Sequence, residues 1–202
     1  MGCTLTPEQL DAAVAFHGHE CPGLTIGLRA AELCLREFGH NNDTPILAVA
    51  ETDMCGVDAI QALTGCTYGK GNLLHRDLGK MAFTFYRTSD GKGFRALLRP
   101  ESHGEAGNLA RSLMKKVFSG QATDEEKRLC GEMRETYREH LLALDLEEVF
   151  AIGEDPPMPR GASILDSLVC EACGESTMES RTRRFAGKIL CIPCFTAVEQ
   201  KI

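Results

Sequence analysis

The sequence predicts an α+β protein in which helices pack against a mixed or antiparallel sheet, followed by a small cysteine-paired domain. Helical patterns outnumber strand patterns, the strands do not alternate regularly with helices, and a proline- and glycine-rich stretch precedes a cysteine-rich end. The chain has 202 residues, of which 43% are hydrophobic and 25% charged, as in globular proteins. We therefore expect a first domain over residues 1–152, a linker over 153–165 and a second domain over 166–202.

Two helices are predicted at the start of the chain. Thr6 and Pro7 are typical of an N-cap and a first helical position, which predicts a helix over residues 7–16. Pro22 opens a second helix in the same way, and apolar residues recur at helical spacing until Gly39 ends it.

The middle of the chain carries the strand patterns. The run "PILAVAE" is short, apolar and partly β-branched, which predicts a buried strand over 46–51 that a helix follows over 56–63. Apolar and polar residues alternate on both sides of "SDGKG", which predicts a β-hairpin of 81–88 with 94–99. Two amphipathic helical patterns complete this domain, over residues 105–120 and 123–144.

Composition excludes several classes of protein. The net charge of -7 disfavours broad contact with nucleic acid, because such contact needs a basic surface. No apolar run approaches the ~20 residues of a membrane helix, and the first residues lack the basic start of a secretory signal. We expect a cytoplasmic protein without membrane contact. Ten cysteines in a reducing compartment then indicate metal binding or thiol chemistry rather than disulfides.

The cysteine-rich end has the spacing of a zinc ribbon. Cys170, Cys173, Cys191 and Cys194 form two C-x2-C pairs separated by 17 residues. Two such pairs let four thiolates surround one Zn²⁺ at about 2.3 Å, and the bound metal supplies folding free energy that so short a segment lacks. Four sulfur ligands leave no position for a substrate, so we expect structural zinc, with an iron or iron–sulfur site as the alternative.

The "RTRR" stretch at residues 181–184 raises a different function for the ribbon, because ribbons can contact phosphates. Residues 170–202, however, contain five Lys or Arg against four Asp or Glu. That balance favours a solvated face over a nucleic-acid footprint. A ribbon that binds nucleic acid or protein is therefore only a third hypothesis for the function.

A second candidate metal site lies near the start of the chain, in "FHGHECPG". If this stretch is extended, the alternate side chains of His17, His19 and Cys21 point to one side. Pro22 places Cys21 at the N-cap of the following helix, where the helix dipole favours a thiolate. We therefore expect these three side chains to act together.

The stretch "ETDMCGVDAIQALTGCTYGKGN" supplies another thiol. Cys55 falls in the opening turn of its predicted helix, with Asp53 as a candidate cap and Asp58 one turn inside, so its thiol also lies near partial positive charge. Lys70 does not belong to a phosphate-binding loop, because the glycine spacing is wrong and no hydroxyl residue follows it.

The stretches "FHGHECPGLTIGLRA" and "ETDMCGVDAIQALTGCTYGKGNLLHRDLGKMAF", with the cysteine-paired end, resemble the FmdE family, named for the E component of formylmethanofuran dehydrogenase. The resemblance covers roughly residues 7–100 and the ribbon. It implies an α+β core, with a sheet also compared with a glyceraldehyde-phosphate dehydrogenase domain, and a homodimer. It also implies a functional cleft at the positions that here are His17, His19, Cys21, Cys55, Cys66 and Lys70.

The leading functional hypothesis is an accessory metalloprotein. His17, His19, Cys21 and Cys55 form a mixed nitrogen and sulfur ligand set that suits zinc, iron or nickel. The family resemblance adds that the protein serves a molybdenum or tungsten redox enzyme or its maturation. The alternative is an enzyme in which Cys21 or Cys55 is a nucleophile or the ligand of an open zinc site, with a histidine as base. A small protein with only a structural ribbon is a further alternative, and the role of His103 stays open.

Overall fold

The computed structural model describes residues 2–154, 157–161 and 163–198, which form two compact units divided after Gly161. The predicted division into residues 1–152, 153–165 and 166–202 stays a prediction. Of the residues in these predicted parts, 1, 155–156, 162 and 199–202 lie outside the described residues.

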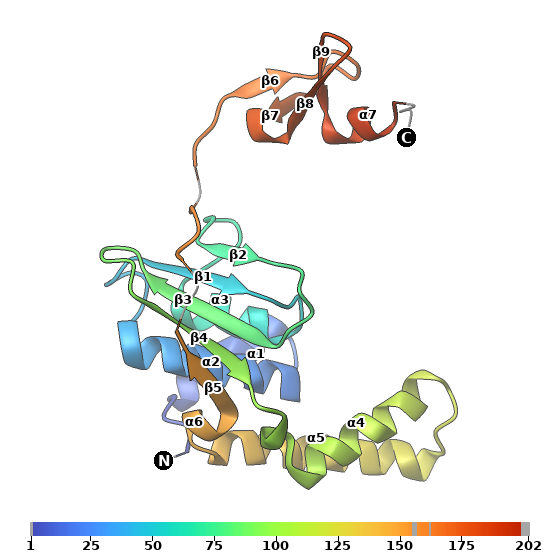
Figure 1. The fold of residues 1–202 in the computed structure, drawn as a ribbon. Coiled ribbons are helices and arrows are strands. Elements are labelled where there is room, and N and C mark those ends of the chain that lie inside the picture. The colour runs from blue at the N-terminus through green and yellow to red at the C-terminus, as the bar shows by residue number, and fades with distance from the viewer. Residues whose placement is uncertain (1, 155–156, 162, 199–202) are drawn as a thin grey trace. The chain divides into compact units, whose positions relative to one another are not determined.

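The first unit combines helices with one sheet (Figure 1). Its elements are α1 (Pro7–His17), α2 (Pro22–Phe38), β1 (Ile46–Ala50), α3 (Gly56–Thr64), β2 (Leu73–His75), β3 (Ala82–Arg87), β4 (Gly93–Leu98), the 3-10 turn η1 (Pro100–His103), α4 (Gly104–Phe118), α5 (Asp124–Ala143), α6 (Leu146–Val149) and β5 (Phe150–Gly153). The strand order is β2-β1-β3-β4-β5, parallel between β1 and β2 and antiparallel elsewhere. The predicted α+β class with a mixed sheet is confirmed.

The main core lies between the sheet and the helices α1, α2 and α3, which lie behind the sheet in Figure 1. Alternation along a strand sends successive side chains to opposite faces. Phe83 and Phe85 of β3 and Phe94 of β4 therefore join the helix-facing core, whereas Tyr86 packs with Leu47 in a cluster on the other face. The α4–α5 hairpin extends beside this body (Figure 1).

Most predicted elements form, and side-chain caps explain the starts of α1, α2 and α5. The Thr6 hydroxyl accepts from the backbone N–H of Gln9, whose side chain accepts from the Thr6 N–H, and Thr123 and Glu126 repeat that arrangement at α5. The prediction missed β2 and β5. Both are very short edge strands, too short to display a periodicity of their own, and they form because β1 and β4 offer hydrogen-bonding partners.

The helices α2 and α3 touch backbone to backbone through two glycines. A Cβ atom on Gly27 would lie 2.2 Å from the carbonyl oxygen of Gly56 and 2.4 Å from its Cα. No side chain fits in that space, so only glycine at residue 27 permits this approach. The contact brings the N-terminal ends of the two helices together, with Cys21 and Cys55 at their N-cap positions.

A buried ion pair holds α2 to its surroundings. Arg29 is fully buried, with its guanidinium 2.8 Å from the Glu32 carboxylate, and it donates to the carbonyl of Leu144 at 2.7 Å. Glu32 in turn accepts from the backbone N–H and the hydroxyl of Thr4, each at 2.7 Å. The two charges pair with each other within α2. The contacts of Glu32 connect α2 to the residues before α1, and the contact of Arg29 connects it to the residue after α5.

The second unit consists of two hairpins and a short helix. Its elements are β6 (Ser167–Val169), β7 (Ser176–Met178), the 3-10 turn η2 (Glu179–Arg181), β8 (Thr182–Phe185), β9 (Lys188–Cys191) and α7 (Ile192–Thr196). The strand β6 pairs with β7, and β8 pairs with β9. Its buried cluster contains little besides Cys170, Leu190 and Cys191, which is too small a core to stabilise a domain by apolar burial alone.

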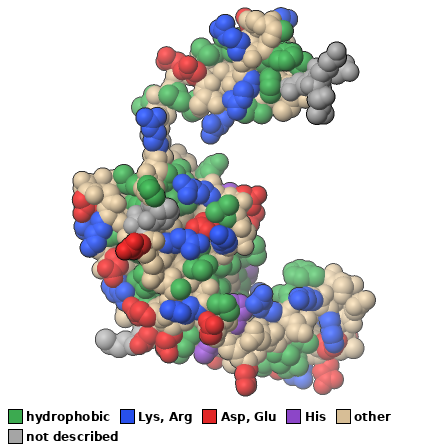
Figure 2. Space-filling view, in the orientation of Figure 1, with side chains coloured by type: hydrophobic (Ala, Val, Ile, Leu, Met, Phe, Trp, Pro, Cys, Tyr) green, Lys and Arg blue, Asp and Glu red, His purple; other side chains and the backbone are tan. Residues whose placement is uncertain are grey.

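Charge is mixed on one face of the first unit (Figure 2). On the face drawn in Figure 2, acidic and basic side chains are interspersed without a broad basic area. Within the part of the chain that the structure describes, no helix combines the length and apolar character needed to cross a membrane.

The glycine contact generates a stability prediction. Gly27→Ala should lower the free energy of unfolding of the first unit by about 3 kcal/mol or more, because the new methyl group overlaps the backbone of Gly56. Gly131→Ala is the matched control: this exposed glycine of α5 has no atom within 4 Å of an added Cβ, so the change should stabilise by about 0.5–1 kcal/mol. Urea unfolding followed by circular dichroism measures both, and equal stabilities would contradict the role of the contact.

Candidate metal centres

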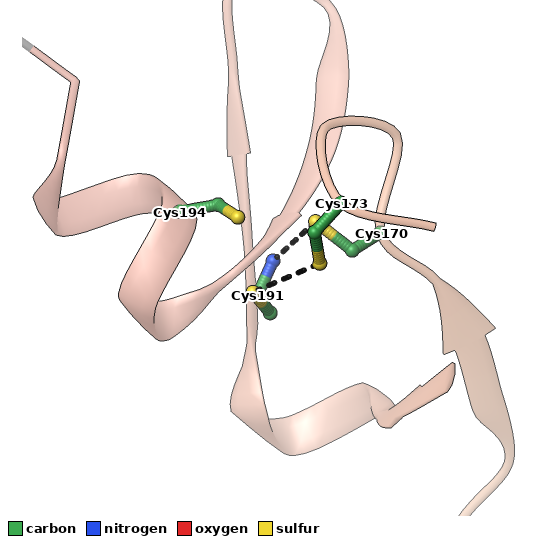
Figure 3. A group of neighbouring side chains, drawn as sticks. All are labelled: Cys170, Cys173, Cys191 and Cys194. Atoms are coloured by element: carbon green, nitrogen blue, oxygen red, sulfur yellow. Dashed lines mark hydrogen bonds between the residues drawn. The ribbon is translucent and has the colours of Figure 1, made fainter. Parts of the chain in front are cut away.

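The four ribbon cysteines converge on one point (Figure 3). Cys170 and Cys173 lie in the turn between β6 and β7, Cys191 ends β9 and Cys194 lies in α7. Their sulfur atoms all lie within 4.8 Å of one another, and Cys173 Sγ is 3.9 Å from Cys191 Sγ. Tetrahedral Zn–S bonds of about 2.3 Å put sulfur atoms about 3.8 Å apart, so the donor set fits one zinc ion.

Backbone N–H groups and neighbouring thiols shift the pKa values of the ribbon cysteines in opposite directions. The backbone N–H groups of Cys173 and Cys191 lower the pKa of Cys170 to about 6. The thiols of Cys191 and Cys173 raise the pKa of Cys194 to about 12. For Cys173, the N–H of Glu175 lowers the pKa, but the Cys170 thiolate and burial outweigh it and the net shift is upward. Metal binding must therefore displace protons from part of this set.

The candidate site near the chain start is a group of His17, His19 and Cys21, whose ligand atoms also lie within 4.8 Å of one another. His17 Nε2 is 3.7 Å from Cys21 Sγ, and the rings of His17 and His19 are 4.5 Å apart between centroids. Bond lengths of about 2.0–2.1 Å to nitrogen and about 2.3 Å to sulfur put tetrahedral N and S ligands about 3.6 Å apart. The observed N–S separation suits a shared ion.

The backbone brings these residues together by a turn, and the expectation of an extended stretch is wrong. His17 is the last residue of α1, and Gly18 adopts a left-handed conformation with φ of 92° that only glycine enters without strain. The chain then reaches Cys21 in extended geometry. Cys21 caps α2 as expected, because its Sγ accepts from the backbone N–H of Leu24 at 3.3 Å.

Cys55 lies beside this group but is not one of its three members. A Cβ added to Gly23 would be 3.6 Å from Cys55 Sγ and 3.9 Å from Cys21 Sγ, so the two thiols lie around the same point beside Gly23. Cys55 itself, not Asp53, occupies the N-cap position of α3, and its side chain makes no capping hydrogen bond. Burial raises the pKa of Cys55, and the nearby Cys21 thiol raises it further. Together these two effects outweigh the expected effect of the helix dipole.

A pocket of about 490 Å³ opens next to the group. It lies where β1 leads into α3 and α3 leads to the parallel strand β2, that is, at the carboxyl ends of the parallel pair and the N-terminal end of the connecting helix. Ligands of α/β crossover units commonly bind there. The lining residues are His17, Ala50, Thr52, Asp53, Met54, Cys55, Val57, Asp58, Gln61, Tyr68, Leu73 and His75.

Four of the six predicted cleft residues do not line this pocket: His19 and Cys21, which belong to the donor group beside it, and Cys66 and Lys70, which lie elsewhere. Cys66 is fully buried and its thiol faces the carbonyl of Ile46 at 3.6 Å, while Lys70 lies on an exposed loop. His103 lines a different pocket, between α4 and α5. His75 lines the pocket and was not foreseen. Its only sequence signal was "NLLH", which is too short to predict a strand parallel to β1.

The fold and the cysteine cluster define an α+β domain followed by a four-cysteine zinc ribbon. A family model described as "FmdE, Molybdenum formylmethanofuran dehydrogenase operon" matches residues 16–151. A second model, "Prokaryotic dksA/traR C4-type zinc finger", matches residues 164–200. The chain belongs to the FmdE family, as its sequence motifs indicated.

Two known proteins are similar over most of the chain. A protein of Archaeoglobus fulgidus named "Probable S-adenosyl-L-methionine-binding protein" is 34% identical over 191 residues, which cover 90% of this chain and 51% of that protein. The chain thus spans about half the length of this curated relative. The crystal structure of a tungsten formylmethanofuran dehydrogenase FmdE-like protein from Syntrophus aciditrophicus matches with a TM-score of 0.62 and 23% identity over 96% of both chains. At that identity, the likeness supports the fold.

The ribbon electrostatics predict how zinc binding depends on pH. Near pH 7, the metal-free protein holds protons on Cys173 and Cys194, whose pKa values are raised, and not on Cys170, whose pKa is about 6. Zinc affinity should therefore fall as the pH falls, more steeply below about pH 6 where Cys170 also binds a proton. Chelator competition between about pH 5 and pH 8, with proton release measured by calorimetry in two buffers, checks this. Affinity independent of pH would contradict it.

Proposed function

We propose that the protein is a metal-binding accessory protein with two metal sites of different kinds. The ribbon holds structural zinc, and the first domain binds a transition metal through His17, His19 and Cys21, with Cys55 as a further ligand. The observation that carries the proposal is the approach of His17 Nε2 to Cys21 Sγ at 3.7 Å, while the other nitrogen of the same ring contacts a carboxylate. Metal-ligating histidines commonly have such an outer partner.

The donor atoms limit which metals the site can hold. Imidazole suits zinc, iron and nickel, and thiolate excludes the hard ions magnesium and calcium. Unlike the ribbon, this group offers three clustered donors and a fourth at its border, beside a pocket. We infer that the metal in the first domain can accept a ligand from the pocket, which a closed four-sulfur site cannot do.

The family supports a proposal for the partner protein. The name of the matching family refers to the molybdenum formylmethanofuran dehydrogenase operon, and the similar crystal structure is of an FmdE-like protein likened to the tungsten enzyme. We propose that the protein acts as a homodimer on a molybdenum or tungsten redox enzyme or its maturation.

The enzymatic alternative divides into two forms. A free thiol nucleophile at Cys55 is disfavoured, because burial raises the pKa of that thiol and the neutral thiol is a poor nucleophile. A zinc-dependent reaction would use the same donors as the proposed metal site, with the pocket as the place of the substrate.

Metal content tests the proposal. The full chain should bind about two metal ions, one per site, and Cys21→Ser or His17→Ala should reduce this to about one by removing a core ligand while leaving the ribbon intact. Cys3→Ser is the control, because Cys3 lies outside both donor groups. Elemental analysis after dialysis gives the number, and an anomalous-scattering scan identifies each metal. A wild-type chain with one metal, held by the ribbon, would refute the core site.

A second candidate function is binding of S-adenosylmethionine in the pocket. One similar protein carries that name, and the pocket has suitable chemistry for a sulfonium cation. Among the described residues that line it, Asp53 and Asp58 are acidic and none is Lys or Arg. Tyr68 is 72% exposed and offers an aromatic face that can attract a cation.

Calorimetric titration checks this second candidate. S-adenosylmethionine should bind more tightly than S-adenosylhomocysteine, which lacks the positive charge. Asp53→Asn should weaken S-adenosylmethionine binding by up to about fivefold, as expected for an exposed charge pair. Asp77→Asn, which changes an exposed carboxylate outside the pocket, should have no effect. Equal binding of the two compounds, or none, would argue against the candidate.

A further inference from the structure

The carboxylate of Asp58 holds His17 in place from the side opposite Cys21. His17 Nδ1 lies 2.7 Å from Asp58 Oδ2, and Nε2 of the same ring lies 3.7 Å from Cys21 Sγ. Each ring nitrogen therefore has its own neighbour. The His17 side chain is only 10% exposed, so these two contacts are not exchanged freely for water.

This arrangement decides which ring nitrogen is available to a metal. An ionised carboxylate only accepts hydrogen bonds, so the contact with Asp58 requires a proton on Nδ1 of His17. In the neutral ring, Nε2 then carries the free electron pair, and it faces Cys21. The carboxylate thus selects the tautomer that can bind a metal at the position shared with the thiol.

Both residues sit on fixed elements. His17 is the last residue of α1, and Asp58 lies in the first turn of α3, where the helix dipole favours an acidic residue. The α3 start is in turn held against α2 by the Gly27 contact. Ring and carboxylate are therefore aligned before any metal arrives, which lowers the cost of ordering the ligand.

We propose that Asp58 is a positioning residue for the metal site of the first domain: it sets the tautomer and ring orientation of His17 and thereby the affinity for the metal. The inference rests on the proposed function, because it concerns the same site. If Asp58 only interacted with the helix dipole, its loss would weaken α3 without changing metal affinity.

The test uses the full chain with zinc. Asp58→Asn keeps the side-chain volume but removes the charge, and its amide can donate as well as accept. It should weaken binding of the core zinc 10–100-fold, the usual cost of losing an outer-shell partner, while zinc in the ribbon is held as before. Asp77→Asn removes an exposed carboxylate outside the pocket and should change core affinity by less than about twofold. Competition with chelators of graded strength measures each site.

A second readout needs no metal. In the metal-free protein, ring nitrogen NMR shifts should place the proton of neutral His17 on Nδ1 in the wild type, whereas Asp58→Ala should show a mixture of the Nδ1–H and Nε2–H tautomers. Circular dichroism identifies any variant that has lost its fold, in which case the other substitution at residue 58 is used. If wild type binds core zinc and Asp58→Asn binds it within twofold, the inference is overturned and the proposed function stands. If wild type binds neither zinc, iron nor nickel at the core site, the proposed function fails, and a proton found on Nε2 overturns the role of Asp58 separately.

Discussion

The backbone contact between Gly27 and Gly56 is the constraint on which the first-domain site depends. Two helices can approach this closely only where neither carries a Cβ at the crossing, and here the added atom would lie 2.2 Å from a carbonyl oxygen. The contact places the N-terminal end of α3 against α2, so Cys55 borders Cys21 and Asp58 reaches the end of α1. Cys55 is thereby brought beside donors that come from a distant stretch of the chain.

The two candidate metal centres both use cysteine sulfur, but for different purposes. The ribbon surrounds its centre with four sulfur atoms and has almost no other core, so its fold and its metal are inseparable. The site of the first domain is built on a core that exists without it, from Phe83 and Phe85 to the buried helix α2. Such a domain does not need a metal with four protein ligands in order to fold. A metal bound there can keep an open coordination position beside the pocket and exchange ligands through it.

Local chemistry made much of the fold predictable. Caps at Thr6 and Thr123, Pro22 at a helix start and the alternation around "SDGKG" each act within a few residues, and the elements they predict are present. The strands β2 and β5 could not be found in this way. Each has three or four residues and becomes a strand only because an already formed neighbour offers hydrogen-bonding groups.

The sequence by itself determined the α+β class, the family and the ribbon ligands, because C-x2-C spacing and short capping motifs act through local geometry. It also brought His17, His19 and Cys21 into one hypothesis, although the left-handed turn at Gly18, not an extended strand, gathers them. Only the tertiary structure decided that Asp58 faces His17, that His75 joins the pocket and that Cys66 is buried away from it. These placements depend on how α3 crosses α2, and a helix crossing is set by packing over the whole core rather than by any nearby residue.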